Sequence, residues 1–442
     1  MRHAIPGLAM LALALISCSG DSPTGADLRG SPPPGPLYRS GGASGDDGLQ
    51  ILAGTSAPGA PFAIVLDANQ LTLDEGGTVT LSARVVNPTG NTVNGAAWAI
   101  GFASSAPSVF TVDPSGLVTA VGPGSATLTL TARTLSKTIP VTVYGHPTGT
   151  GRTTTATPAG YYPYGVGVSA TGAVLVTIKS PINVLLRGDL PSTALPTSIP
   201  VGVTPTGVTP DFVGAEAYVT NQGSSNLGVV DLLATPNSQV ATVPLAGNPF
   251  VSALSPDGKT IWVALGSVAK VALVDAASHT VTTMINVGGG PNGIAFSGTP
   301  SAPYAYVSST TSGTITVINT NTNAVVTTLT TGGRPQGMGF SRDFQELYVA
   351  NETLGRLEVW NTATNLKAAD IALGGSPFGV AVSPDDKQVW VTDLTGKIHT
   401  VDRVARTFTS TTVGGRPRRL SFDRFGGTLV VANESGWVDY VH

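Results

Sequence analysis

Seven side chains that could contact a ligand share one feature, because each directly follows a proline that recurs every 40 to 44 residues. The prolines are Pro163, Pro205, Pro249, Pro291, Pro335, Pro377 and Pro417, and the residues after them are Tyr164, Thr206, Phe250, Asn292, Gln336, Phe378 and Arg418. Aromatic rings stack on sugars and peptides, and amides orient them. Arg334, Arg416 and Arg419 lie beside these positions and would favour an anionic group. Together these residues predict a mouth that binds a ligand. The alternative is that these positions only pack the loops and solvate the mouth.

Three acidic residues suggest a different chemistry on the same side of the repeat. Glu352, Asp393 and Glu434 each lie near the end of a predicted strand. Carboxylates that converge can hold Ca²⁺ or Mg²⁺, and such a metal would support a hydrolase or lyase. Solvated loop acids are the simpler interpretation, in which case no cofactor is expected.

Histidine placement favours a binding module over an enzyme. The five histidines are His3, His146, His279, His399 and His442. An acid or base catalyst would have to lie at the mouth, and none of the five is expected there. We also expect no Ser-His-Asp grouping and no haem-attachment motif.

The elements that position these residues follow from the repeat length. A unit of about 40 to 45 residues suits one small four-stranded sheet. Proline fixes φ where the first strand begins, and turns such as Ser255-Pro256-Asp257-Gly258 separate the first two strands. Tyr218-Val219-Thr220-Asn221 ends a predicted second strand, with variants at Tyr348–Asn351 and Val430–Asn433.

These residues resemble the signature of the YVTN-repeat β-propellers, and the resemblance covers Gly151 to His442. It implies an all-β fold in which residues 146–442 form seven blades around a channel. Only 25 residues follow Pro417, enough for three strands. We therefore expect Arg152–Thr157 to supply the outer strand of the seventh blade and to cover its edge. Propellers of this size include binding modules and enzymes such as lactonases, so the resemblance implies a fold more than a function.

Residues 61–145 show about seven short alternating strands, the spacing of an immunoglobulin-like sandwich. Expected strands include Val79–Val86 and Trp98–Phe102. The stretch Ser104–Asp113, followed by Ser115–Val121, resembles the bacterial group 2 immunoglobulin-like domain, with Trp98 as its strand tryptophan. Such domains serve as spacers or as adhesins, and both interpretations stay open.

The N-terminus carries targeting information. Residues 1–17 combine Arg2 with the apolar run Leu8–Ile16, as in a signal peptide. Cys18, the only cysteine, follows Leu15-Ile16-Ser17, which resembles a bacterial lipobox. The resemblance implies lipidation at Cys18 and a membrane anchor, at the outer membrane or cell surface, with the periplasmic side as the alternative. Residues 18–60 have no apolar pattern and predict a disordered tether.

Composition further narrows the possible fold classes and partners of the protein. The chain has 442 residues, of which 11% are charged, with 55 glycines and 33 prolines, and this favours short strands and turns. A net charge of −3 gives no positive electrostatic field that would attract a phosphate backbone. No nucleic-acid partner is therefore expected. One cysteine excludes a disulfide framework. We expect a monomer whose ligand is an envelope polymer, a peptide or a partner protein.

Overall fold

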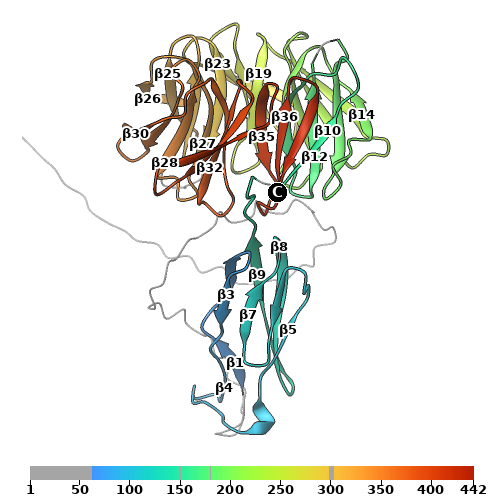
Figure 1. The fold of residues 1–442 in the computed structure, drawn as a ribbon, viewed down its shortest axis with the longest axis vertical. Coiled ribbons are helices and arrows are strands. Elements are labelled where there is room, and N and C mark those ends of the chain that lie inside the picture. The colour runs from blue at the N-terminus through green and yellow to red at the C-terminus, as the bar shows by residue number, and fades with distance from the viewer. Residues whose placement is uncertain (1–61, 150, 180, 298–302) are drawn as a thin grey trace, which may run out of the picture. The chain divides into compact units, whose positions relative to one another are not determined.

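The computed structural model describes residues 62–149, 151–179, 181–297 and 303–442. Almost all of them lie in strands and turns (Figure 1), which confirms the all-β class. One short 3₁₀ helix spans Ala96–Trp98. Within these residues, no helix has the length and apolar character needed to cross a membrane. The predicted signal peptide, Cys18 and the tether lie outside the described residues.

The N-terminal strands form three small sheets around a shared core. One sheet pairs β1 (Ala63–Leu66) with β4 (Ala83–Val86). A second has the order β2 (Leu71–Asp74), β9 (Leu135–Tyr144), β8 (Gly124–Ala132) and β5 (Gly101–Ser104). The third has the order β3 (Thr78–Thr80), β7 (Leu117–Ala120) and β6 (Phe110–Val112). Phe110, Leu128 and Val141 are fully buried between them.

Two predictions for this region are wrong in detail. Val79–Val86 is not one strand, because β3 pairs with β7 whereas β4 pairs with β1. The chain changes sheet at Leu81, which is buried and donates its N–H to the carbonyl of Gly116 at 3.0 Å. Trp98 lies in the 3₁₀ turn, which Gly95 opens at a φ of 135°, and not in a strand.

The remaining strands form seven four-stranded antiparallel sheets, which we number one to seven. Sheet one contains β11 (Pro163–Val168), β12 (Ala173–Ile178), β13 (Val184–Asp189) and β14 (Thr197–Pro200). Sheet two contains β15 (Pro205–Pro210), β16 (Glu216–Asn221), β17 (Asn226–Asp231) and β18 (Ser238–Pro244). Sheet three contains β19 (Pro249–Leu254), β20 (Thr260–Leu265), β21 (Lys270–Asp275) and β22 (Thr280–Asn286). Sheet four contains β23 (Pro291–Phe296), β24 (Tyr304–Ser309), β25 (Thr314–Asn319) and β26 (Ala324–Thr330).

Sheets five to seven repeat the pattern. Sheet five contains β27 (Pro335–Phe340), β28 (Glu346–Asn351), β29 (Arg356–Asn361) and β30 (Leu366–Ala372). Sheet six contains β31 (Pro377–Val382), β32 (Gln388–Asp393), β33 (Lys397–Asp402) and β34 (Phe408–Thr412). Sheet seven contains β35 (Pro417–Phe422), β36 (Leu429–Asn433), β37 (Trp437–Val441) and, as its outer strand, β10 (Arg152–Ala156). Each repeated proline therefore begins the first strand of a sheet.

Contacts between first strands run from sheet to sheet and return to the start. β11 contacts β15, and the series continues through β19, β23, β27 and β31 to β35, which contacts β11. As expected, β10 pairs with β37, from Arg152 opposite Val441 to Ala156 opposite Trp437. Sheet seven is thus built from segments nearly 300 residues apart.

A hydroxyl at the next-to-last residue of the second strand connects neighbouring sheets. In sheet six, Thr392 Oγ1 accepts a hydrogen bond from the Gly379 N–H at 2.8 Å and donates to the Arg418 carbonyl at 2.5 Å. In sheet four, Ser308 Oγ bonds to the Gly293 N–H and the Gln336 carbonyl at 2.9 and 2.7 Å. In these two sheets the bridge holds the backbone of the residue after the next proline, which is Gln336 or Arg418.

The last residue of the second strand shapes the loop before the proline. Asn351 Oδ1 accepts the Arg334 N–H at 3.0 Å, and its Nδ2 donates to the Gly332 carbonyl at 2.9 Å. Asn433 makes the matching bonds at 2.8 and 3.0 Å to the loop that carries Arg416. Asparagine at this place in sheets five and seven thus positions the loops of the candidate site.

Candidate functional site

The residues that follow the repeated prolines do come together. The Tyr164 ring packs edge-to-face on Phe250 and Phe378, with centroids 5.9 and 6.5 Å apart. The Arg418 guanidinium carbon lies 5.0 Å from the centroids of both the Tyr164 and the Phe378 rings. These contacts suit the negative faces of aromatic rings. Four residues from four different sheets therefore form one cluster.

The two amides form a second part of this group. Asn292 Nδ2 donates to Gln336 Oε1, and Gln336 Nε2 donates to Glu352 Oε2. Arg418 in turn donates from Nε to Glu434 Oε2 at 2.7 Å. Each polar side chain thus has a partner within the protein.

Burial corrects the expectation of open aromatic faces. Tyr164, Thr206, Asn292, Gln336 and Phe378 are all buried, while Phe250, Arg418 and Arg419 are partly exposed. Burial raises the pKa of Tyr164, although Arg418 and Arg419 oppose the shift. The rings pack on one another and on guanidinium groups, so they present little free surface on which a sugar could stack.

Charged side chains in the neighbouring loops form a rim, which we define as Lys179, Arg334, Glu352, Arg416 and Glu434. The side chains of Arg334 and Arg416 are 54% and 56% exposed. Those of Glu352 and Glu434 are only 18% and 19% exposed. Glu352 lies 3.7 Å from Arg334, and Glu434 lies 3.9 Å from both Arg416 and Lys179. The charge that the rim presents to solvent is therefore positive.

A shallow cavity of about 390 Å³ adjoins the rim, lined by Tyr162, Lys179, Arg416 and Glu434. Tyr162 is exposed. Lys179 Nζ lies 4.3 Å from the centroid of the Tyr164 ring. Burial lowers the pKa of Lys179, and Glu434 opposes that shift. This cavity offers an aromatic surface beside two cations.

The three acidic residues considered as metal ligands are not grouped together. Glu352 and Glu434 accept hydrogen bonds from Gln336 and Arg418. Asp393 is buried, and its Oδ2 lies 3.1 Å from His399 Nε2. Each carboxylate thus has separate partners, and nothing in this geometry favours a shared ion.

The expectation that no Ser-His-Asp grouping exists is wrong. His399 Nδ1 lies 2.8 Å from Ser410 Oγ, while its Nε2 contacts Asp393. Ser410 is exposed, and it lies directly opposite His399 on the neighbouring strand. The grouping joins the second, third and fourth strands of sheet six.

Comparison between sheets shows that this grouping is a variant of a structural contact. In sheet five the same places on the second and third strands hold Asn351 and Glu358, which are joined by a 3.0 Å hydrogen bond. Asp393 Oδ1 also accepts N–H groups from Ser376 and Thr395, at 3.0 and 2.8 Å, as Asn351 does in its own loop. Aligning the repeats at the last residue of the second strand would have revealed this pair in the sequence.

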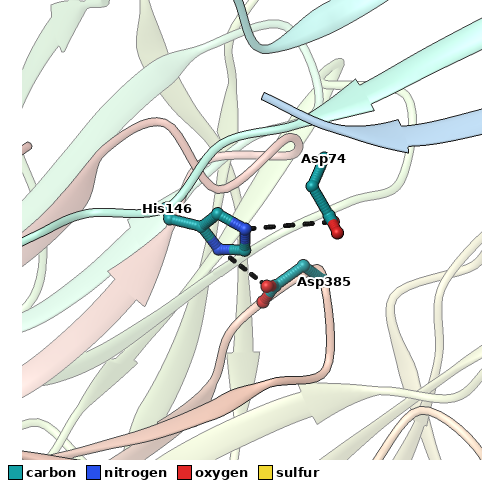
Figure 2. Close-up of side chains that lie close together, drawn as sticks. All are labelled: Asp74, His146 and Asp385. Atoms are coloured by element: carbon teal, nitrogen blue, oxygen red, sulfur yellow. Dashed lines mark ion pairs between the residues drawn. The ribbon is translucent and has the colours of Figure 1, made fainter. Parts of the chain in front are cut away.

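A further group, which the sequence did not suggest, involves Asp74, His146 and Asp385 (Figure 2). His146 Nδ1 lies 2.7 Å from Asp385 Oδ2, and its Nε2 lies 3.9 Å from Asp74 Oδ1. These are side chains that could hold a metal ion. However, Lys387 Nζ lies 2.5 Å from Asp74 Oδ2 and 3.4 Å from His146 Nε2. The Lys387 ammonium group thus already supplies the positive charge that a metal ion would bring to these carboxylates.

Comparisons with known proteins identify architecture only. Residues 84–134 match the family model of the intimin immunoglobulin-like domain, a type typical of surface and exported proteins, so the region is immunoglobulin-like. No curated protein sequence matches the chain. A chain of Kuenenia stuttgartiensis hydrazine synthase is similar in structure, with a TM-score of 0.59 at 17% identity, over 65% of this chain and 97% of that one. At this identity the likeness shows a propeller-like β fold and nothing of function.

Proposed function

We propose that the protein is an exported, lipid-anchored binding module whose seven sheets form a YVTN-type β-propeller. The return of first-strand contacts from β35 to β11 supports a seven-bladed ring. The hydroxyl bridge of Thr392 and the loop contact of Asn351 support the YVTN assignment. They explain why threonine and asparagine occur at the end of the second strand. The immunoglobulin-like region supports a location outside the cytoplasm.

The anchor rests on the sequence alone. Cys18 follows an apolar run that suits a lipoprotein signal. Radiolabelled palmitate should enter the wild-type protein and not the Cys18→Ser variant, which should also leave the membrane fraction. Equal labelling of both proteins would contradict the anchor.

The ligand that fits the rim best is an acidic polysaccharide. The observation that carries this proposal is the exposure of Arg334 and Arg416 above carboxylates that are largely covered. Guanidinium groups pair with carboxylates in a bidentate geometry. The exposed ring of Tyr162, beside Lys179 and Arg416 in the shallow cavity, provides a surface on which a sugar can stack. Several weak contacts along one polymer add to a useful affinity.

The experiment compares polygalacturonate with neutral dextran by calorimetry. We expect saturable binding of polygalacturonate only, weakened at least tenfold in the double variant Arg334→Gln/Arg416→Gln and weakened by salt, which screens exposed charges. Lys259→Gln is the matched control, because Lys259 is exposed in a first-to-second strand turn.

Two results would overturn this proposal. The first is polygalacturonate binding that survives the double variant, since it would place the site elsewhere. The second is tighter binding of polyglutamate than of polygalacturonate, since it would point to an acidic protein segment as the partner.

A further inference from the structure

A second cavity, of about 160 Å³, lies among the first strands of all seven sheets. Its lining is almost entirely glycine and aliphatic side chains, including Val166, Val208, Ile294 and Met338. Ser252 adds one hydroxyl, and Arg419 is the only charged residue among those that line it. The cavity thus combines polar backbone and hydroxyl groups with aliphatic side chains and a single cationic side chain.

The position of Arg419 in the repeat explains why its side chain lies there. Five sheets carry glycine two residues after the proline, at Gly165, Gly207, Gly293, Gly337 and Gly379. A Cβ at Gly337 would lie 2.7 Å from the Phe378 carbonyl oxygen, and one at Gly379 would lie 2.7 Å from the Arg418 carbonyl oxygen. Close packing of first strands therefore requires glycine at these places. In sheet seven the place is taken by arginine, and its long side chain extends into the space that the glycines leave.

The guanidinium of Arg419 is incompletely satisfied. Its Nη2 donates to Asn292 Oδ1 at 2.9 Å, and its Cζ lies 5.6 and 5.4 Å from the Phe250 and Phe378 ring centroids. Its Nε is buried and has no hydrogen-bond partner. Within the described part of the chain, no carboxylate forms an ion pair with it. Burial lowers the pKa of Arg419 to about 10, so the group is still charged at neutral pH.

Arg419 is only partly exposed, and a charge that is largely removed from water without a counterion is costly. Its buried Nε without an acceptor adds to that cost. A bound anion would remove both costs. One cation favours one negative charge, and the aliphatic wall favours an apolar remainder. A cavity of about 150 Å³ is known to hold a six-carbon ring, so a ligand of about six non-hydrogen atoms fits.

We propose that the central cavity binds a short aliphatic monocarboxylate, with its carboxylate on the Arg419 guanidinium and its alkyl chain against Val166, Ile294 and Met338. This site is separate from the rim, because neither Arg334 nor Arg416 lines the cavity. The two proposals can therefore fail independently.

The test is calorimetric titration of the full chain with sodium butyrate, with butyramide as its uncharged counterpart. We expect saturable butyrate binding and none of butyramide. Arg419→Met, which keeps the length of the side chain and removes the charge, should weaken butyrate binding at least tenfold. Arg419→Gly, which introduces the residue found in five of the other six sheets, should do the same and should fold, because the repeat accommodates glycine there. Arg424→Met is the matched control, since Arg424 is exposed in the turn after β35.

Three outcomes would overturn the proposal. One is the absence of saturable butyrate binding to the wild-type protein. Another is equal binding to the Arg419→Met and Arg424→Met variants. The third is complete displacement of butyrate by an equal concentration of chloride, which would show that the cavity selects charge alone and ignores the alkyl chain.

Discussion

At the scale of single residues, Asp393 combines a structural bond with a titratable charge. Burial pushes the pKa of Asp393 upward, but hydrogen bonds from His399 and from the Ser376 and Thr395 N–H groups prevail and hold it at about 2. Because the folded pKa lies below the value of about 3.9 for an unfolded aspartate, Asp393 stabilises the fold above that value. The contribution is lost as the pH falls toward 2.

Asp393→Asn should separate these two roles. Asparagine can still accept the Ser376 and Thr395 N–H groups, as Asn351 accepts Arg334 in sheet five, so stability at pH 7 should change by only about 1 kcal/mol. Between pH 4 and pH 2 the variant should lose less stability than the wild type. Thermal unfolding across this range measures the difference.

The control for this prediction is Asp393→Ala, which removes the acceptor as well. It should lower the unfolding midpoint at every pH from 7 to 2. Parallel pH profiles for the wild type and Asp393→Asn would show that the carboxylate charge adds nothing to stability.

At the scale of elements, the repeat was readable from the sequence wherever a backbone constraint selects one residue type. The prolines mark the first strands because their φ is fixed. Thr220, Asn351 and Asn433 mark the ends of second strands because their side chains bond to backbone groups. Side-chain contacts across sheets were not readable. Gln336 pairs with Asn292 of another sheet, and burial of Tyr164 depends on Phe250 and Phe378 together, so position in the repeat could not reveal that the predicted mouth packs on itself.

The hydroxyl bridge predicts the cost of removing it. Thr392→Val leaves the Gly379 N–H and the Arg418 carbonyl without this partner, in a buried place. Each buried backbone group that loses its partner costs about 1–3 kcal/mol. For these two groups we expect a loss of about 2–6 kcal/mol in the free energy of unfolding, measured with urea.

Thr409→Val serves as the comparison for this change, because Thr409 is exposed on β34, where valine suits a strand. It should alter stability by less than about 0.5 kcal/mol. If Thr392→Val behaved like Thr409→Val, the bridge would not contribute to the coupling of sheets six and seven.

At the scale of the whole molecule, the sequence predicts the fold class of the N-terminal region but not which of its strands pair. Alternation of apolar residues indicates strands, but it does not say which sheet a strand joins. This is why the sequence predicts a single strand over Val79–Val86, although Leu81 carries the chain from β3 to β4. The partner of β10 was easier to predict, since a sheet with three strands has one unpaired edge.

Sheet seven also determines when folding can be completed. Thr154 Oγ1 donates to Asp439 Oδ1 at 2.7 Å, a bond between residues made at nearly opposite ends of the synthesis of residues 146–442. A polypeptide emerging from the ribosome cannot form this pairing until residues 437–441 have been synthesised. Until then the edge of β10 lacks its partner and is open to pairing with another chain. The closing strand therefore delays completion of sheet seven until all seven sheets have been synthesised.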